Sequence, residues 1–213
     1  MAHENKVELI GTYGSDVSHA SSAWTSTSRE LTDEKRGRIG KLLTMLAKNG
    51  HGSPFEKSSI HLLITTDMAS HIHLLRHRIS SINAESARYK ELNDNKFYIP
   101  DDWPEDEQTL LIKHSEESIK KYHDCLARLI TAGVPRKRAK ESARFYLPYS
   151  NQLTADVMYN FRSFLSMINL RNHEDAQKEI RDIAKQMLIL VYETGQFNLS
   201  LEAFGWSKDK IFA

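Results

Sequence analysis

The chain has 213 residues, of which 40% are hydrophobic and 27% are charged, values that are ordinary for one globular domain and that argue against intrinsic disorder. Because 29 Lys and Arg residues nearly cancel 28 Asp and Glu residues, the formal net charge is +1, and we expect no whole-molecule field that attracts nucleic acid. One cysteine excludes an internal disulfide, and neither a secretory signal nor a bilayer-spanning apolar run is evident, so we expect a cytoplasmic protein.

The first fifty residues predict one strand and one helix. Residues 7–13 are rich in β-forming residues and end at Gly14, which favours a strand. Residues 15–28 are rich in Ser, Thr and Ala and are expected to form a loop. Thr32 suits the N-cap of a helix whose apolar residues recur at helical spacing, and Gly50 occupies the position of a C-cap glycine.

The middle of the chain adds a strand and three helices. Residues 58–66 are apolar and β-branched and predict a strand, whereas residues 68–79 predict a helix with Ile72, Leu75 and Ile79 on one face. The polar residues 93–107 contain two prolines and predict a loop. A long helix is expected over residues 107–132, followed after Gly133-Val134-Pro135 by a helix that runs towards Arg144. The inward positions of the long helix are Leu111, Ile119, Tyr122, Leu126, Leu129 and Ile130.

The last part of the chain contains the clearest helical pattern. Residues 152–159 are compatible with a strand or a helix, and residues 160–170 favour a helix. Residues 175–194 carry apolar side chains at i, i+3 and i+4 steps, with Gly195 behind them. The whole pattern predicts an α+β fold, in which a small antiparallel sheet packs against several helices, with residues 1–213 as a single domain with long helices.

The residues that suggest chemistry lie between Arg76 and Tyr89. If residues 68–79 are helical, then His73, Arg76 and His77 share one face of that helix. Asn83, Ser86 and Arg88 follow within a few residues. This density of cationic, amide and hydroxyl groups suits a phosphate-bearing ligand, because arginine binds phosphate oxygens in a bidentate manner. The alternative for an isolated Arg-His-Arg is a solvated basic helix end, since arginine also complements the helix dipole.

This segment resembles the signature of the flavin-dependent thymidylate synthases, which is Arg-His-Arg, seven residues and then Ser, here with residues 79–85 as the seven and Ser86 as the serine. Four further segments resemble pieces of the same family in the family's order. They are His-Gly-Ser-Pro-Phe-Glu (51–56), Ala-Arg-Phe-Tyr-Leu-Pro (143–148), Asn-Phe-Arg-Ser (160–163) and Asn-Leu-Arg (169–171). Together these segments are highly specific.

The resemblance implies an activity, its cofactor and an assembly. It implies reductive methylation of dUMP to dTMP, with methylenetetrahydrofolate as the carbon donor and with FAD, reduced by NADPH, as the hydride source. It also implies a homotetramer whose active sites are shared between subunits. The cofactor supplies the redox chemistry, while the protein supplies positioning and electrostatics.

The resemblance also assigns roles to individual residues. The expected catalytic residues are Arg171, at the uracil ring, and Ser86. Arg171 precedes Asn172, which suits the N-cap of the helix from residue 175, so we expect a rigidly held guanidinium. The expected FAD residues are His51, Ser53, Arg76, His77, Arg78, Asn83, Asn160, Arg162 and Ser166. The expected dUMP residues are His73, Arg76, Glu85, Ser86, Ala87, Arg88, Arg144 and Arg171.

The chain departs from the family pattern at three places. His73 stands where the family usually has Gln, although an imidazole can still form a hydrogen bond. Ala84 follows the motif's Asn83 where the family often has Glu, and Glu85 comes one position later. Ser166 replaces a family Asn near the flavin with a shorter side chain.

Some residues of the chain also fit roles other than flavin and dUMP binding. His73 and His77 have the i, i+4 spacing of metal ligands, but there is no His-Glu-x-x-His pattern, so we expect no metal. Cys125 lies beside an apolar stripe and is expected to be a buried, inert thiol rather than a nucleophile. The basic run 136–140 is read as a solvated helix face, with attraction of folate carboxylates as another possibility. The alternative function is a small nucleic-acid-binding protein that uses this run and the Arg-His-Arg helix.

Overall fold

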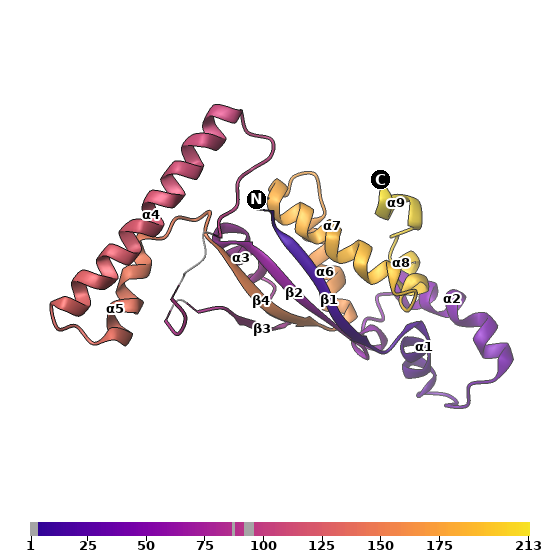
Figure 1. The fold of residues 1–213 in the computed structure, drawn as a ribbon. Helices are drawn as coiled ribbons and strands as arrows, with labels where there is room; N and C mark the ends of the chain where they lie inside the picture. The colour runs from indigo at the N-terminus through magenta and orange to yellow at the C-terminus, as the bar shows by residue number, and fades with distance from the viewer. Residues whose placement is uncertain (1–3, 87, 92–95) are drawn as a thin grey trace. The chain divides into compact units, whose positions relative to one another are not determined.

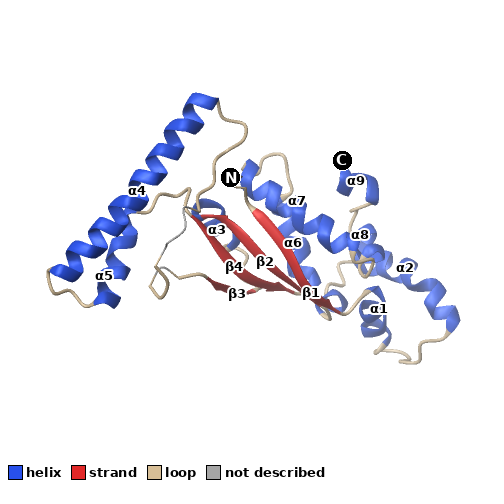
Figure 2. Cartoon of the chain, viewed as in Figure 1, coloured by secondary structure: helices blue, strands red, loops and turns tan. Residues whose placement is uncertain are grey.

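The computed structural model describes residues 4–86, 88–91 and 96–213 and contains a four-stranded antiparallel sheet in the order β1-β2-β4-β3 (Figure 1). The strands are β1 (Lys6–Tyr13), β2 (Ser59–Asp67), β3 (Ser81–Ala84) and β4 (Gln152–Tyr159). Figure 2 shows the strands together with the helices that follow them in the chain. The α+β class and the small antiparallel sheet predicted from the sequence are therefore confirmed.

The helices among the described residues fall at or near most of the predicted positions. They are α1 (Asp16–Trp24), α2 (Asp33–Lys48), α3 (Met68–Leu74), α4 (Glu105–Thr131), α5 (Arg136–Ala143), α6 (Phe161–Arg171), α7 (Lys178–Glu193), α8 (Asn198–Ala203) and α9 (Lys208–Phe212), with the 3-10 turns η1 (Ser53–Glu56) and η2 (Arg144–Tyr146). In the described ranges, no helix is both long and apolar enough to cross a membrane.

Contacts group the chain into two compact units. Unit 1 comprises residues 1–6, 65–76 and 83–155, and unit 2 comprises residues 7–64, 77–82 and 156–213. The extent of the chain as a single domain, residues 1–213, stays a prediction.

In unit 1, α4 and α5 lie side by side as an antiparallel pair (Figure 1). Tyr122 and Leu126 of α4 pack against Ala139 and Ala143 of α5, all of them buried. Two alanines on α5 have no bulk to hold the helices apart, so the backbones approach closely and the pair excludes water. Cys125 is only partly buried against this cluster, and not fully buried as predicted; that its thiol is inert stays a prediction. The prediction that Ile130 points inward is wrong, because this side chain is 36% exposed.

In unit 2, the apolar stripe of α7 is buried as its periodicity predicts. All six positions, Ile180, Ile183, Ala184, Met187, Leu188 and Val191, are inaccessible to solvent. The strand β2 buries every second residue along most of its length, which gives its sheet one face towards the core and one more open face. Thr32 caps α2 by accepting a hydrogen bond from the amide of Lys35, and Gly50 has the positive φ of +72° that a helix-terminating glycine adopts.

Two element predictions are wrong, and tertiary contacts explain both. Residues 15–28 were expected to form a loop, but they contain α1, whose small residues let Ala20 and His19 become fully buried. The helix predicted over residues 68–79 ends at Leu74. Its buried face is Ser70, His71 and Leu74, whereas Ile72, Leu75 and Ile79, the three residues expected to share a face, are all exposed. Residues 152–159, which the sequence left open, form a strand.

The prediction that Asn172 begins a helix is also wrong. Asn172 is the C-cap of α6, and Arg171 is the last residue of that helix, whereas α7 begins only at Lys178. The amide of Asn172 donates to the carbonyl of Ile168, which continues the α6 ladder by one residue. The backbone of Arg171 is therefore fixed by the end of α6, where a cation also complements the helix dipole.

A buried hydrogen-bonded network in unit 2 connects α1 with α8 and with Ser58, the residue before β2. His19 is fully buried, and its Nδ1 and Nε2 each lie 2.9 Å from a serine hydroxyl, of Ser200 and of Ser58 respectively. The hydroxyl of Ser200 donates to Asp16, so it accepts from His19 Nδ1–H, and Nε2 accepts from Ser58. The ring is thus neutral, and burial lowers the pKa of His19 to about 4.

This network predicts a pH-dependent stability. In the unfolded chain the histidine binds its proton with a pKa near 6.5, whereas in the folded protein its pKa is about 4. The unfolded state therefore binds more protons between these values, and stability falls as the pH falls. We expect the contribution of His19 to the free energy of unfolding to fall by about 2 kcal/mol from pH 7 to pH 5, measured by urea denaturation.

The control for this prediction is His19→Gln, which keeps a neutral hydrogen-bonding side chain but cannot titrate. The neighbouring Asp16, whose pKa is raised by burial in spite of its hydrogen bonds, is present in both proteins. The difference between the two pH profiles therefore isolates His19. If the variant loses as much stability as the parent chain between pH 7 and pH 5, the buried neutral histidine is not the source.

Candidate active site

The signature loop of unit 1 (residues 85–91, of which 87 lies outside the described residues) is fastened to β4 by Glu85. The amide of Thr154 donates to Glu85 Oε2 at 2.9 Å, and Lys90 Nζ donates to Oε1 at 3.2 Å. Burial raises the pKa of Glu85, but the Thr154 amide and the Lys90 ammonium group outweigh it, so the net pKa is lowered and the carboxylate is ionised. Both oxygens thus accept hydrogen bonds within unit 1, and the predicted contact of Glu85 with substrate stays a prediction.

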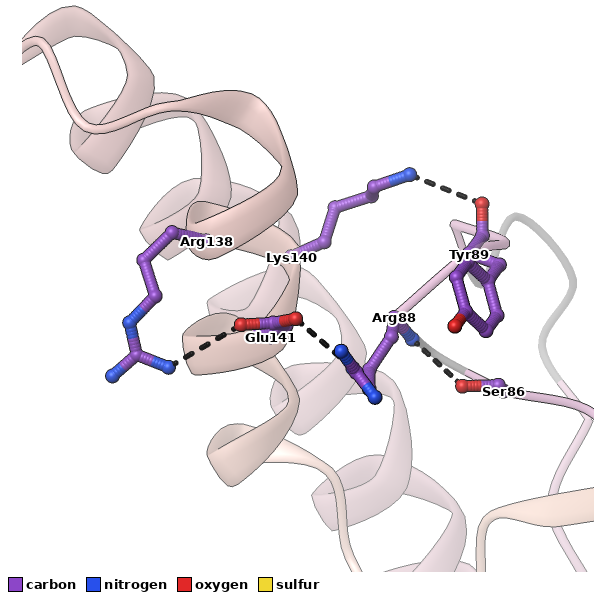
Figure 3. A network of polar contacts seen from close by, with 6 residues as sticks. All are labelled: Ser86, Arg88, Tyr89, Arg138, Lys140 and Glu141. Atoms are coloured by element: carbon purple, nitrogen blue, oxygen red, sulfur yellow. Dashed lines mark hydrogen bonds and ion pairs between the residues drawn. The ribbon is translucent and has the colours of Figure 1, made fainter.

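Arg88, two residues after the signature's Ser86, is bound to the neighbouring helix α5. Its Nε donates to Glu141 Oε1 at 2.9 Å, and its amide donates to Ser86 Oγ at 3.3 Å (Figure 3). Lys140, next to Glu141, donates to the carbonyl of Tyr89 at 3.0 Å. The loop conformation that presents Ser86 and Arg88 is therefore set by side chains of α5.

Three predicted substrate residues, Glu85, Ser86 and Arg144, line one cavity of unit 1, whereas Arg88 is not among its lining residues. Ser86 belongs to the signature loop, and Arg144 begins η2 directly after α5. The cavity has a volume of about 470 Å³, within the range of pockets that bind small molecules. Its walls also include residues that the sequence analysis did not single out, among them Lys90, Phe145, Tyr149 and Asn151. Of these, Phe145 lies in the family-like segment 143–148, and Lys90 is a cation two positions after Arg88.

The other predicted residues of unit 1 lie on α3, on the turn after it and on β3. His73 is the penultimate residue of α3, and its Nδ1 is buried without a hydrogen-bond partner among the described residues. An unpaired buried ring nitrogen is costly and suits a ligand atom, so it can take the place of the family's glutamine. Arg76 and Asn83 are exposed, and Ala87 lies outside the described residues. Because α3 ends at Leu74, the expected helical face of His73, Arg76 and His77 does not form.

In unit 2, Arg171 is anchored by His77 of the signature. Arg171 Nε donates to His77 Nε2 at 3.0 Å. A guanidinium can only donate, so Nε2 accepts, and the proton of the neutral ring is on Nδ1. Ser80 Oγ donates to the carbonyl of His77 at 2.6 Å, which holds the residue from its backbone side. Two predicted functional residues 94 positions apart are thereby brought into direct contact.

A second guanidinium of unit 2 lies against the segment that carries His51 and Ser53. Arg162, in the first turn of α6, donates to Glu56 Oε1 of η1 at 2.6 Å. A Cβ atom on Gly52 would lie only 2.7 Å from Arg162 Cζ, so the absence of a side chain there lets the guanidinium approach the backbone. His51 and Ser53, which flank this glycine, are thus grouped with Arg162 as predicted, and all three belong to unit 2.

The remaining predicted cofactor residues lie on or near α6. Asn160 Oδ1 accepts from the amide of Ser163 at 2.9 Å and caps the helix, so this oxygen has a structural role. Ser166 is exposed one turn after Arg162, on the same helix face. Arg78 is also exposed. Two exposed guanidinium groups and a hydroxyl fit an anionic dinucleotide such as the flavin cofactor that the resemblance implies.

The described residues offer no cluster of metal ligands. Within residues 4–86, 88–91 and 96–213, no three His, Cys, Asp or Glu side chains lie close enough together to hold a metal ion. The imidazole of His77, one of the two histidines with metal-ligand spacing, is instead the acceptor for Arg171.

Comparisons with known proteins identify the family of the chain. A family model described as thymidylate synthase complementing protein matches residues 8–194. A flavin-dependent thymidylate synthase of Pseudothermotoga lettingae is 34% identical over 189 residues, covering 84% of this chain and 80% of that protein. One from Tropheryma whipplei is 32% identical over 204 residues, covering 83% of each chain.

Among solved structures, a UMP/dUMP methylase, PolB from Streptomyces cacaoi, bound with 5-Br dUMP, is similar over 97% of both chains, with a TM-score of 0.79 and 27% sequence identity. A second structure of that protein, bound with 5-Br UMP, has a TM-score of 0.77. The family match spans both units and includes every segment that carries the sequence resemblance. The chain therefore belongs to the family of flavin-dependent thymidylate synthases, FAD enzymes that methylate dUMP to dTMP.

Proposed function

We propose that the cavity of unit 1 is the dUMP site of this enzyme, and that the guanidinium groups of unit 2 serve FAD and the uracil ring. The observation that carries the proposal is the convergence of Ser86 and Arg144 on one cavity. These residues lie 58 positions apart and belong to two separate segments of the family pattern. A shared cavity is expected if both segments exist to bind one ligand.

The chemistry of the cavity suits a nucleoside monophosphate. Arg144 and Lys90 supply positive charge for a phosphate, and Ser86 supplies a hydroxyl that can donate to a phosphate oxygen. Phe145, Leu147 and Leu153 supply apolar surface, against which a pyrimidine ring can pack. The related methylase was solved with both a dUMP and a UMP analogue, so UMP is the appropriate second substrate in every assay of this chain.

The flavin residues of unit 2 fit the cofactor through their charge. Arg78 and Arg162 would pair with the pyrophosphate, and the bare backbone of Gly52 lets the Arg162 guanidinium lie close against the chain. Asn160 fixes the first turn of α6 and so fixes the direction of Arg162. When bound, FAD supplies the hydride that converts the transferred carbon into a methyl group.

Arg171 is proposed to stabilise negative charge on the uracil ring. Its Nε is occupied by His77, so the side chain is held without using the two terminal nitrogens. Because the imidazole that holds it is neutral, the full positive charge of the guanidinium is retained. Preorganised charge of this kind is most effective where charge develops during the reaction.

The remaining features of the proposal concern co-substrates, assembly and location. NADPH and methylenetetrahydrofolate are the family's reductant and carbon donor. We further propose a homotetramer with active sites shared between subunits, located in the cytoplasm.

FAD binding is the first expected outcome. The purified chain should be yellow and should bind FAD at micromolar protein concentration, measured by absorbance and fluorescence titration. Replacement of Arg162 by Ala should raise the dissociation constant for FAD by about 10- to 100-fold, because a charge-assisted hydrogen bond is worth about 1.5–3 kcal/mol. Arg38→Ala, which also removes an arginine paired with a glutamate, is the matched control and should bind FAD normally. A parent chain that binds no FAD would refute the proposed function.

Arg171 gives a second expected outcome. Arg171→Ala should keep FAD but lose about 100- to 1000-fold in turnover and should lose dUMP binding, because the charge at the uracil ring is removed. Arg171→Lys should not restore activity, since a point charge lacks the planar fork and the Nε that His77 accepts from. Turnover of tritiated dUMP is the measurement, and Arg181→Ala on α7 is the control. Near-normal turnover in a folded, yellow Arg171→Ala protein contradicts the assignment.

Assembly gives a third expected outcome. A tetramer with shared sites should have the mass of four 24.5 kDa chains in multi-angle light scattering at working concentration. Activity should fall on dilution if subunits dissociate, because sites built from several chains are lost together. A monomeric mass in a fully active preparation would rule out shared sites.

A further inference from the structure

Glu141 lies between two guanidinium groups on the side of α5 that faces the signature loop (Figure 3). Its Oε1 accepts from Arg88 Nε at 2.9 Å, and its Oε2 lies 3.6 Å from Arg138 Nη1. The Glu141 side chain is 19% exposed, against 43% for Arg88 and 63% for Arg138. The carboxylate is therefore the best shielded member of the group, and the contact is less screened by water than an ordinary surface ion pair.

The same stretch of α5 also holds the backbone of the loop. Lys140 donates to the carbonyl of Tyr89, and Arg136 forms an ion pair with Glu91. The Arg88 guanidinium lies 5.6 Å from the centroid of the Tyr89 ring, which restricts it from a third side. Main chain and side chain of Arg88 are thus both fixed in unit 1 before any ligand arrives.

The way in which Glu141 holds Arg88 leaves its phosphate-binding edge open. Glu141 takes only the Nε–H, and no described residue accepts from Nη1 or Nη2 of Arg88. These two nitrogens form one edge of the fork that pairs with phosphate oxygens. Three residues after Glu141, the chain reaches Arg144, which lines the cavity with Ser86. One carboxylate therefore ties the loop of Ser86 and Arg88 to the segment that carries Arg144.

We propose that Glu141 is a positioning residue for the phosphate of dUMP, acting through Arg88. It holds the guanidinium through Nε, which leaves the terminal nitrogens for the phosphate, and it ties the signature loop to the segment that carries Arg144. This inference rests on the proposed function, because it takes Arg88 as a dUMP ligand. The mutual effect on ionisation agrees with it: the hydrogen bond from Arg88 lowers the pKa of Glu141, and Glu141 raises the pKa of Arg88.

Glu141→Ala and Glu141→Gln test the role of the carboxylate. With Glu141→Ala we expect the KM for dUMP to rise by about tenfold or more, with kcat at saturating dUMP within about twofold of the parent chain, since the lost interaction acts on binding. The KM of Glu141→Gln for dUMP should lie between those of the parent chain and Glu141→Ala, because the amide oxygen of glutamine can still accept from Arg88 Nε. Glu34→Gln, which removes a carboxylate paired with an arginine on α2, is the matched control and should change neither constant.

Two further readouts separate positioning from a general structural role. Binding of deoxyuridine, which has no phosphate, should be weakened far less by Glu141→Ala than binding of dUMP. In an Arg88→Ala background, Glu141→Ala should have almost no further effect on dUMP affinity, because its target is gone. FAD affinity and the thermal unfolding midpoint should stay at parent values in Glu141→Gln, which shows that this variant is folded.

The inference is overturned if Glu141→Ala leaves the KM for dUMP within about twofold or lowers it, if deoxyuridine and dUMP are weakened equally, or if the effects of Glu141→Ala and Arg88→Ala are additive. The same experiments distinguish failure of this inference from failure of the proposed function. A parent chain without dUMP binding refutes that function, and the inference with it. An active parent chain in which Arg88→Ala weakens dUMP but Glu141→Ala does not refutes only the inference.

Discussion

A guanidinium on a long, flexible side chain is useful to a ligand only if the protein has already fixed its direction. Losing the rotamer freedom of an arginine costs about 2 kcal/mol, so the entropy lost when a ligand orders an unanchored guanidinium offsets much of the binding free energy. In this chain three arginines of the family pattern each have one nitrogen held by a partner in their own unit: Arg88, Arg162 and Arg171. The proposed dUMP cavity of unit 1 and the proposed ligand contacts of unit 2 both depend on such anchoring.

The partners differ in charge, and the difference matches the proposed roles. Glu141 and Glu56 are carboxylates, so Arg88 and Arg162 enter binding as oriented but locally neutralised pairs. Such pairs suit phosphates, which bring charge of their own and whose oxygens match the fork. His77 holds Arg171 with a neutral ring, so its full positive charge remains for a ring on which negative charge appears only during the reaction.

The sequence pattern correctly predicted those elements whose formation depends on neighbouring residues in the chain. The stripe of α7, the cap and terminator of α2, and the pair of α4 and α5 follow from apolar spacing and from Thr32, Gly50 and Pro135. The predictions were wrong where contacts with residues distant in the sequence determine the local structure. The loop-like composition of residues 15–28 is overridden by burial of His19 and Ala20, and α3 stops early and turns a different face inward. The site shows the same division: motif residues were found, whereas Glu56 and Glu141 were missed as anchors because their contacts span 106 and 53 positions.

The basic run 136–140 shows how charge in a sequence can mislead about partners. Alone it was compatible with a surface for nucleic acid or folate. In the structure, Arg136 pairs with Glu91, Lys140 binds the carbonyl of Tyr89, and Arg138 lies against Glu141. Ala139, in the middle of the run, is buried against α4 instead. One side of α5 thus packs by small apolar residues, and the other fastens the loop that carries Ser86 and Arg88. A cation that already neutralises a carboxylate or binds a carbonyl contributes little to a long-range field, and this is why the run is better understood as the support of a binding loop than as a binding surface in its own right.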